Sequence, residues 1–328
     1  MGGPESAPGL PVVVALFGPT GVGKTAVGAR VAETLGVRVI SCDSLQVYRG
    51  LPILTNQPQA VDGRHAEALV GVAGPEEEWT AAVYASRAVP LIEQDLATTG
   101  WAFISGGTGL YLRAALAPLA MAPPADAALR ASLEERLRLE GPERLHSELA
   151  ERDPTAAARI HPRNARRVVR ALEISMGEPG GAFSERDELW KPRYRHPTLL
   201  VGLTMDRHEL WERIDRRARE MVQRGAVEEV RHNRMVLQPG KGAAKAIGYQ
   251  EIVALLDGEA TEQQTIDRIA QATRRYAKRQ LTWMRRLEDA VIMDATGREP
   301  DDLARAVVDL AVGMKAGFDQ ERSDDAVR

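Results

Sequence analysis

The stretch GPTGVGKT, Gly18 to Thr25, matches the template G-x-x-x-x-G-K-[ST], which is typical of loops that cradle phosphate. The apolar run VVVALF (Val12 to Phe17) precedes it and predicts a strand. A helical pattern follows it, with Gly36 at the position of a C-terminal cap. Because strand, glycine loop and helix are the context that the motif requires, we interpret the stretch as a phosphate-binding loop rather than as a chance glycine-rich turn.

The residue types of this loop fit phosphate chemistry. Gly18, Gly21 and Gly23 permit backbone amides to point inward at a helix N-terminus, where the helix dipole also favours an anion. Lys24 can neutralise phosphate oxygens, and Thr25 can hold Mg²⁺. The motif leaves the reaction open, since the phosphate can be transferred, hydrolysed or released.

Further strands alternate with helices along the first third of the chain. VRVISCD (37–43) reads as a second strand, and WAFISGGTGLYL (101–112) reads as another strand that runs into a glycine-rich turn. This alternation predicts an α/β fold with a parallel sheet, helices on both faces and ligands beyond the carboxyl ends of the strands. Asp43 and Thr108 both follow such ends.

The pattern changes at about residue 118, and only helix signals occur from there to Gly177. A polar loop and the strand-like stretch TLLVGLTMD (198–206) follow, and the rest of the chain is mainly helical. We predict a discontinuous α/β core (11–117 and 198–315) with a helical C-terminal part and a helical insertion domain (118–197). Residues 1–10 and 316–328 are expected to be flexible tails.

Composition narrows the class of protein. The 328 residues are 44% hydrophobic and 27% charged, which is ordinary for a globular protein, and no apolar run approaches the roughly 20 residues that a membrane span needs. The single cysteine, Cys42, excludes an internal disulfide and a cysteine-rich zinc site. With no secretory pattern at the start, we expect a cytoplasmic protein without membrane contact.

Asp43 and Thr108 are candidate site residues with structural alternatives. Asp43 can bind magnesium or accept a proton from an attacking group, or it can be a helix N-cap, given Ser44 beside it. Thr108 can hydrogen-bond a substrate or cap the next helix. For Gln46, position alone favours a solvated polar side chain.

Two basic stripes suggest a polyanionic partner. The formal net charge is −3, yet acid-poor basic faces recur, and solvated helices normally mix both signs. Phosphates of RNA or DNA would explain them, and a solvated face is the alternative. The stripes consist of Arg159, Arg163, Arg166, Arg167 and Arg170, and of Arg274, Arg275, Lys278, Arg279, Arg285 and Arg286.

These blocks occur in an order that resembles the tRNA dimethylallyltransferases, also called tRNA isopentenyltransferases, of the bacterial kind. The blocks are GPTGVGKT, ISCDSLQVYRGLPILTNQP, ISGGTGLYLRAAL, DPTAAARIHPRNARRVVRALEI, AIGYQE and TRRYAKRQLTWMRR. The resemblance covers roughly residues 12–286, and six blocks in order are far more specific than any one of them.

The resemblance implies transfer of a dimethylallyl group from dimethylallyl diphosphate to N6 of adenosine 37 of tRNA, with release of diphosphate. It implies a P-loop NTPase-like core and a helical insertion that hold the tRNA while the target base is flipped out. Asp43 would accept the proton of N6 and Thr108 would position the base or the diphosphate. Lys24, Arg217 and Mg²⁺ at Thr25 would neutralise the leaving group.

The resemblance also assigns binding residues to a monomeric enzyme. The residues for the diphosphate are Gly18, Pro19, Thr20, Gly21, Val22, Gly23, Lys24, Thr25, Arg213 and Arg217, with Arg217 preferred over Arg213. The residues for the anticodon stem-loop of tRNA are Asp43, Ser44, Leu45, Gln46, Thr108, Arg130, Arg166, Arg167, Arg170, Gly248, Tyr249, Lys278, Arg279, Gln280, Trp283 and Arg285. Glu251 departs from the family pattern, which puts a phosphate contact there in doubt.

Three rival functions stay open. An adenylate isopentenyltransferase acting on free AMP, ADP or ATP would leave the helical insertion and the basic stripes without a purpose. A P-loop kinase would need a phosphoacceptor site and lid arginines, for which the sequence gives no signal. A non-catalytic RNA-binding module would leave the phosphate loop and Asp43 unused.

Overall fold

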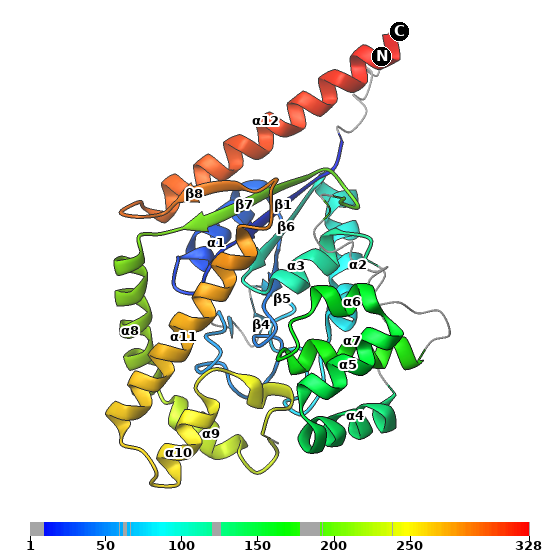
Figure 1. The fold of residues 1–328 in the computed structure, drawn as a ribbon. Helices are drawn as coiled ribbons and strands as arrows, with labels where there is room; N and C mark the ends of the chain where they lie inside the picture. Colours follow the sequence, from blue (N-terminus) through cyan, green and yellow to red (C-terminus); the bar gives the residue numbers. More distant parts are fainter. Residues whose placement is uncertain are drawn as a thin grey trace. The chain divides into compact units, whose positions relative to one another are not determined.

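The computed structural model describes residues 10–58, 60–61, 64–65, 67–119, 126–177, 191, 193–237 and 239–327. The chain divides into two compact units. One unit comprises residues 1–118 and 192–328, and the other comprises residues 119–191. Figure 1 follows the chain through both units.

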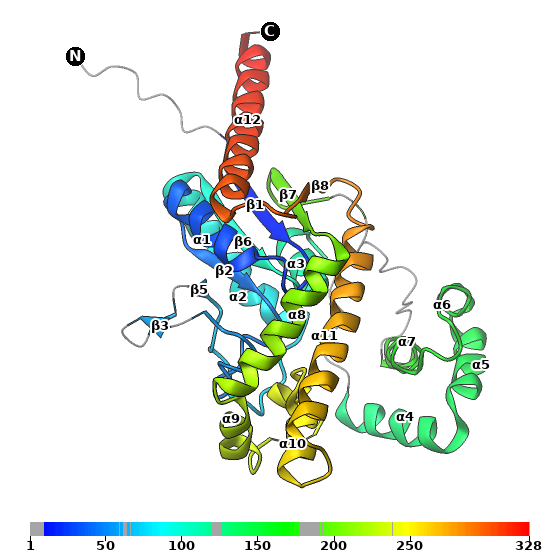
Figure 2. The same cartoon turned by 90° about the vertical axis from the view of Figure 1, so that its left-hand side faces the viewer.

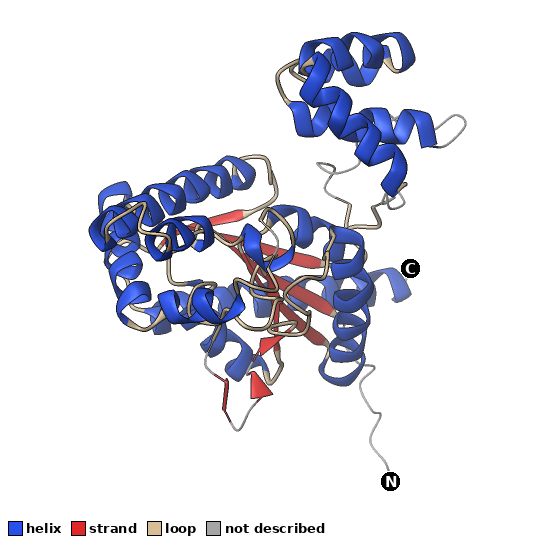
Figure 3. Cartoon of the chain, turned by 90° about the horizontal axis from the view of Figure 1, so that it is seen from below, coloured by secondary structure: helices blue, strands red, loops and turns tan. Residues whose placement is uncertain are grey.

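The first unit is built on a six-stranded sheet in which every pair of neighbouring strands is parallel. The predicted parallel α/β fold is therefore confirmed, and Figure 3 shows the strands surrounded by helices. Across the sheet the order is β5 (Glu67–Ala68), β2 (Val39–Cys42), β6 (Trp101–Gly106), β1 (Val12–Phe17), β7 (Thr198–Thr204) and β8 (Val291–Asp294). The edge strands β5 and β8 had no clear signal in the sequence, and neither had the antiparallel pair β3 (Ala60–Val61) and β4 (Arg64–His65).

Helices cover this sheet and extend beyond its carboxyl edge. Helix α1 packs against α12, α2 packs against α3, and the long helices α8 and α11 pack side by side, as Figure 2 shows. The helices of this unit are α1 (Lys24–Leu35), α2 (Ala81–Thr99), α3 (Gly109–Leu116), α8 (Arg207–Gln223), α9 (Ala226–Asn233), α10 (Tyr249–Leu256), α11 (Glu262–Met284) and α12 (Pro300–Val327), with a 3₁₀ turn at Gly242–Lys245.

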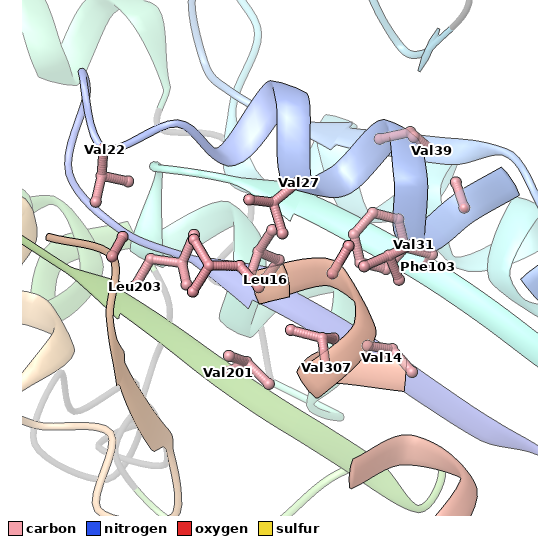
Figure 4. Packing of buried hydrophobic residues seen from close by; sticks show 14 of the residues in the cluster. Val14, Leu16, Val22, Val27, Val31, Val39, Phe103, Val201, Leu203 and Val307 are labelled. Carbon is pink, nitrogen blue, oxygen red and sulfur yellow. The ribbon is translucent and has the colours of Figure 1, made fainter. Parts of the chain in front are cut away.

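The core lies between the sheet and the helices α1 and α12. Figure 4 shows Val27 and Val31 of α1 and Val307 of α12 against Phe103 and Val201 of the strands. All five side chains are buried. A strand that is covered on both faces is a continuous apolar run, which is why VVVALF contains no polar residue.

The register of the sheet brings three loops together. Phe17 and Cys42 both lie opposite Gly106, from either side of β6. The loops that leave these strands therefore begin beside one another at the carboxyl edge of the sheet. The backbone N–H groups of Gly107 and Thr108 both donate to the carbonyl of Cys42, each at 3.2 Å. The sheet thus fixes where the phosphate loop, Asp43 and Thr108 start.

The C-terminal segment differs from expectation. We expected a flexible tail from residue 316, but helix α12 continues to Val327. The Lys315 ammonium donates to the carbonyl of Leu10 at 2.6 Å and lies 5.0 Å from the ring centroid of Trp101. Asp319 accepts the Leu10 N–H at 2.8 Å. These contacts attach the helix to the start of β1, which explains why it does not end earlier. The expected tail at residues 1–9 lies outside the described residues.

The second unit is helical throughout its described part. Its helices are α4 (Ala127–Glu140), α5 (Pro142–Arg152), α6 (Pro154–Arg159) and α7 (Ala165–Gly177). The Asp126 carboxylate caps α4, and Asp153 caps α6 ahead of a proline in its first turn, as the sequence predicts. Leu133, Leu145 and Val168 belong to its apolar core.

Candidate active site

The glycine loop wraps around the N-terminus of α1. Gly21 and Gly23 adopt φ values of +88° and +103°, which side chains with a Cβ rarely tolerate. The Lys24 ammonium folds back and donates to the carbonyls of Gly18 (3.0 Å) and Pro19 (2.9 Å). Thr25 is exposed in the first turn of the helix. The loop therefore presents the amide-lined concave shape that binds phosphate.

The electrostatics of Lys24 favour an anion beside it. Burial, opposed by the carboxylate of Asp43 and assisted by the positive charge of Arg217, lowers the pKa of Lys24 to about 8. A phosphate beside the ammonium would favour its charged form.

Asp43 has a structural role and remains available for chemistry. Its Oδ1 accepts the N–H groups of Leu45 (2.8 Å) and Gln46 (3.3 Å), so the capping interpretation is correct for this oxygen. No hydrogen bond to Oδ2 is found among the described residues, and Asp43 lines two adjoining cavities. One oxygen holds the turn, and the other can accept a proton.

Thr108 joins the turn after β6 to the loop that carries Asp43. Its Oγ1 accepts the Ser44 N–H at 3.1 Å and lies 3.3 Å from the Ser44 hydroxyl. It makes no capping hydrogen bond to helix α3, although it occupies the N-cap position. The capping alternative is therefore wrong for its side chain, which instead fixes the residue next to Asp43.

The two arginines that we considered for the diphosphate differ in their partners. Arg217 donates from Nη1 to the Thr20 hydroxyl at 3.1 Å and faces the charge of Asp43. Arg213 donates to the Glu209 carboxylate at 2.8 Å, one helical turn away. Both line the cavity above the phosphate loop. Only Arg217 contacts the loop itself by a hydrogen bond that the structure records.

Two cavities of different character meet at these residues. A polar cavity of about 380 Å³ lies over the phosphate loop and is lined by Lys24 and Thr25 among others. A smaller cavity of about 60 Å³ adjoins it between α8, α11 and the residues Ala246 and Ile247 that precede α10. The residues that line both are Thr20, Asp43, Thr55 and Arg217. The apolar residues that line the smaller cavity are Leu45, Leu54, Ile214, Ala218, Met221, Ala246, Ile247 and Ile269.

Sequence reasoning missed two residues of this site. Glu67, on the two-residue strand β5, lines the polar cavity, and burial together with Asp43 raises its pKa to about 7. Tyr276 lines the smaller cavity, and burial raises its pKa. No periodicity marks a two-residue strand, and Tyr276 is the aromatic residue inside a stripe that we considered only for its charges.

The predicted tRNA residues of α11 divide into two groups. Lys278, Arg279 and Arg285 are exposed, as expected for phosphate contacts. Gln280 is only 4% exposed, and Trp283 packs closely on the backbone of Gly109. The Gln280 amide is hydrogen-bonded to two backbone groups at the wall of the polar cavity, so its contact with tRNA stays a prediction.

Three other predicted tRNA residues also have interior roles. The Gln46 amide accepts from Ser41 (3.2 Å) and donates to the carbonyl of Asn56 (2.7 Å), so it is not the solvated side chain that position alone favours. Leu45 packs against the apolar cluster next to α10. Tyr249 is 2% exposed in the same cluster.

Glu251 has a structural function. Its carboxylate accepts the Gly248 N–H at 3.1 Å at the start of α10. Gly248 has a φ of +101°, and a Cβ there would lie 2.8 Å from Leu54, so the glycine is required by the backbone. The acid that departs from the family pattern thus stabilises a helix N-terminus.

The basic residues of the second unit also divide into two groups. Arg166 and Arg167 are exposed on α7, and the described residues contain no ion pair to either. Arg170 and Arg130 instead approach the buried carboxylate of Glu173, at 2.9 Å and 3.7 Å. Arg166 and Arg167 are consequently the pair with charge directed to solvent.

Two features are absent from the described residues. No group of three or more His, Cys, Asp or Glu side chains is arranged there to hold a metal ion. Within the same residues, no helix combines the length and the apolar character of a transmembrane span.

The parallel sheet, the glycine loop on α1 and the polar cavity above it define an α/β protein with a P-loop NTPase-like core. The IPP transferase family model matches residues 46–287, and an isopentenyl transferase model matches residues 11–63. The chain belongs to the IPP transferase family.

Proteins named tRNA dimethylallyltransferase are similar over most of their length. The one from Thermomicrobium roseum is 44% identical over 289 residues, which are 87% of this chain and 86% of the relative. The one from Symbiobacterium thermophilum is 41% identical over 300 residues, 88% of this chain and 91% of the relative.

Solved structures agree with this family. The full-length tRNA isopentenylpyrophosphate transferase of Bacillus halodurans superposes with a TM-score of 0.69 at 34% identity, covering 95% of this chain and 99% of that one. A eukaryotic dimethylallyltransferase described as acting on tRNA gives a TM-score of 0.73 at 27% identity, covering 87% of this chain and 74% of that one.

Proposed function

We propose that this protein transfers a dimethylallyl group from dimethylallyl diphosphate to N6 of adenosine 37 of tRNA and releases diphosphate. The observation that carries the proposal is the junction of a polar and an apolar cavity at Thr20, Asp43 and Arg217. A ligand with an anionic head and a short branched hydrocarbon chain matches that junction. The names of the relatives agree with this reaction.

The diphosphate would occupy the polar cavity. The loop amides at the start of α1, Lys24 and Arg217 are the positive groups beside it. Charge grows on the diphosphate as its bond to carbon breaks, so donors that are already in position stabilise the transition state more than the ground state. Arg213 lies within the same cavity but is bonded to Glu209.

The dimethylallyl chain would enter the apolar cavity, with its reacting carbon close to Asp43. The N6 lone pair attacks that carbon, the carbon–oxygen bond breaks, and the electron pair leaves with the diphosphate. The proton of N6 goes to Asp43, whose Oδ2 has no hydrogen bond among the described residues. Its Oδ1 stays bonded to the Leu45 and Gln46 N–H groups, which keeps the base oriented.

Thr25 would supply the protein ligand of Mg²⁺. Magnesium in phosphate sites is commonly held by one or two protein oxygens together with the phosphates of the substrate, and the exposed Thr25 hydroxyl at the loop fits that pattern. When bound, the ion would neutralise diphosphate oxygens.

The anticodon stem-loop of tRNA would contact the exposed basic residues. Lys278, Arg279 and Arg285 of α11 and Arg166 and Arg167 of α7 present charge to solvent, and such contacts provide most of the salt-dependent affinity for nucleic acids. The target base would be flipped towards Asp43. Because tRNA is the substrate, we expect the reaction to occur in the cytoplasm, with the protein acting as a monomer.

Transfer of labelled dimethylallyl to unmodified tRNA tests the proposal directly. Incubation with labelled dimethylallyl diphosphate and tRNA should label the tRNA, whereas incubation with AMP should give no product. Label in AMP but not in tRNA would favour an adenylate isopentenyltransferase. Loss of the γ-phosphate of ATP without any prenyl transfer would favour a kinase.

A further inference from the structure

Gln280 lies where helix α11 meets the two glycine loops of the site. Its Oε1 accepts the Thr20 N–H of the phosphate loop at 2.8 Å. Its Nε2 donates to the carbonyl of Gly107, in the turn after β6, at 2.9 Å. An amide is the side chain that can accept from one backbone group and donate to another. The two partners also fix its orientation, since only Oε1 can face an N–H donor.

The contact between Gln280 and Gly107 leaves no room for a side chain at position 107. A Cβ on Gly107 would lie 2.1 Å from Gln280 Nε2, with the next contacts at 3.3 Å. The glycine therefore allows the amide to approach the turn. No positive φ is required of Gly107, so the close approach of Gln280 is the main constraint on that position.

Both loops that Gln280 joins lead to reacting groups. Thr20 also accepts a hydrogen bond from Arg217 through its hydroxyl, so Gln280 and Arg217 hold the phosphate loop from different sides. Gly107 precedes Thr108, whose hydroxyl accepts the N–H of Ser44, next to Asp43. A displacement of the Gln280 amide would therefore shift both the phosphate loop and the residues that hold Asp43.

We propose that Gln280 is a positioning residue that holds the phosphate loop and the Gly107–Thr108 turn in register for prenyl transfer. It acts through its hydrogen bonds to Thr20 and Gly107, at the wall of the polar cavity in which the diphosphate would lie. This inference rests on the proposed function for the identity of the reaction. It differs from the tRNA contact that the family resemblance implies for Gln280, because it ties the residue to the diphosphate and to the chemical step instead of to tRNA affinity.

The first test compares Gln280→Met with Gln271→Met, an exposed glutamine of the same helix. Binding of inorganic diphosphate is measured by calorimetry, tRNA binding by filter retention, and kcat by single turnover. Loss of two backbone hydrogen bonds should weaken diphosphate binding and kcat by about tenfold each, with tRNA affinity unchanged within about twofold. The Gln271 variant should match the wild type.

Gln280→Glu provides a variant of nearly the same shape. It keeps an acceptor for the Thr20 N–H, but it places a second oxygen against the Gly107 carbonyl and adds negative charge beside the diphosphate site. Diphosphate binding should therefore fall further than in Gln280→Met. Recovery towards the wild-type affinity in Gln280→Glu would overturn the assignment, as would a loss confined to tRNA binding in either variant.

The close contact at Gly107 gives an independent test. Gly107→Ala should displace the Gln280 amide and reproduce the defect of Gln280→Met. Combining it with Gln280→Ala, which removes the clash, should add less than about twofold to the effect of either change. Effects that multiply would show that the two residues act separately. Diphosphate binding by the wild type without prenyl transfer to tRNA would contradict the proposed function and leave these binding comparisons valid.

Discussion

Replacing Arg217 and Arg213 separately by methionine tests which of them stabilises the leaving group. The two residues lie one turn apart on α8, line the same cavity and carry the same charge, so their long-range electrostatic effects are matched. They differ in local contacts. Arg217 bonds to Thr20 of the phosphate loop at 3.1 Å, and Arg213 bonds to the Glu209 carboxylate at 2.8 Å.

The magnitude follows from this difference. A hydrogen bond to a charged group contributes about 1.5–3 kcal/mol, and a factor of ten in rate corresponds to about 1.4 kcal/mol. Arg217→Met should therefore lower kcat/KM for dimethylallyl diphosphate by roughly 10- to 150-fold. Arg213→Met should cost less than about fivefold, because removing one partner of a half-exposed ion pair is worth about 1 kcal/mol at most.

The assay measures initial rates of label transfer from dimethylallyl diphosphate at saturating tRNA. Arg217→Lys keeps the charge but loses the planar fork of the guanidinium, so its rate should fall between those of the wild type and Arg217→Met. A defect in Arg213→Met that equals or exceeds that of Arg217→Met would refute the argument. In that case the hydrogen bond between Arg217 and Thr20 would not identify the arginine that binds the diphosphate.

Three further changes test other parts of the site. Asp43→Asn keeps an acceptor for the turn but cannot take a proton, so single-turnover rates should fall by about 10²-fold or more with tRNA affinity retained; unchanged rates would exclude Asp43 as the base. Replacing Arg166 and Arg167 by alanine should weaken tRNA binding and reduce the slope of log K against log salt by about 1.5 to 2, whereas an unaltered slope would make both residues part of a solvated face. Met221→Ala should enlarge the apolar cavity and raise transfer from geranyl diphosphate relative to dimethylallyl diphosphate by roughly tenfold, as measured by the mass of the tRNA product; an unchanged ratio would mean that the chain binds elsewhere.

The central part of the site was predictable because the sequence shows where three of the strands end. Each of the strands β1, β2 and β6 is an apolar run that ends at a glycine or a carboxylate, and parallel strands present their carboxyl ends at one edge. That geometry placed the phosphate loop, Asp43 and Thr108 together. The pairing of Phe17 and Cys42 with Gly106 is consistent with that expectation.

Glu67 could not be predicted in the same way. It becomes part of the site because the short strand β5 adds to the sheet beside β2, opposite Val39. Two residues are too few to show the alternation that marks a strand. Its position depends on tertiary contacts that no local pattern records.

The interior hydrogen bonds of Gln280 could have been predicted from helix geometry. Lys278 and Arg279 precede it, and successive residues of an α-helix point about 100° apart. Ala277, Gln280 and Met284 are buried and share one face of α11. A polar residue on a buried stripe predicts internal hydrogen bonds. The family resemblance assigned Gln280 to tRNA together with its basic neighbours, without the use of that signal.

Asp43 shows why a capping interpretation and a catalytic one need not compete. A carboxylate has two oxygens, and a capped turn uses one of them, as the bonds from Leu45 and Gln46 to Oδ1 do. Those bonds hold Oδ1 in place, and Asp43 lines both cavities. The Thr108 hydroxyl secures the next residue, Ser44. As the proposed base, Asp43 would require little reorganisation when the substrate arrives, and the bonds that cap the turn would also orient it.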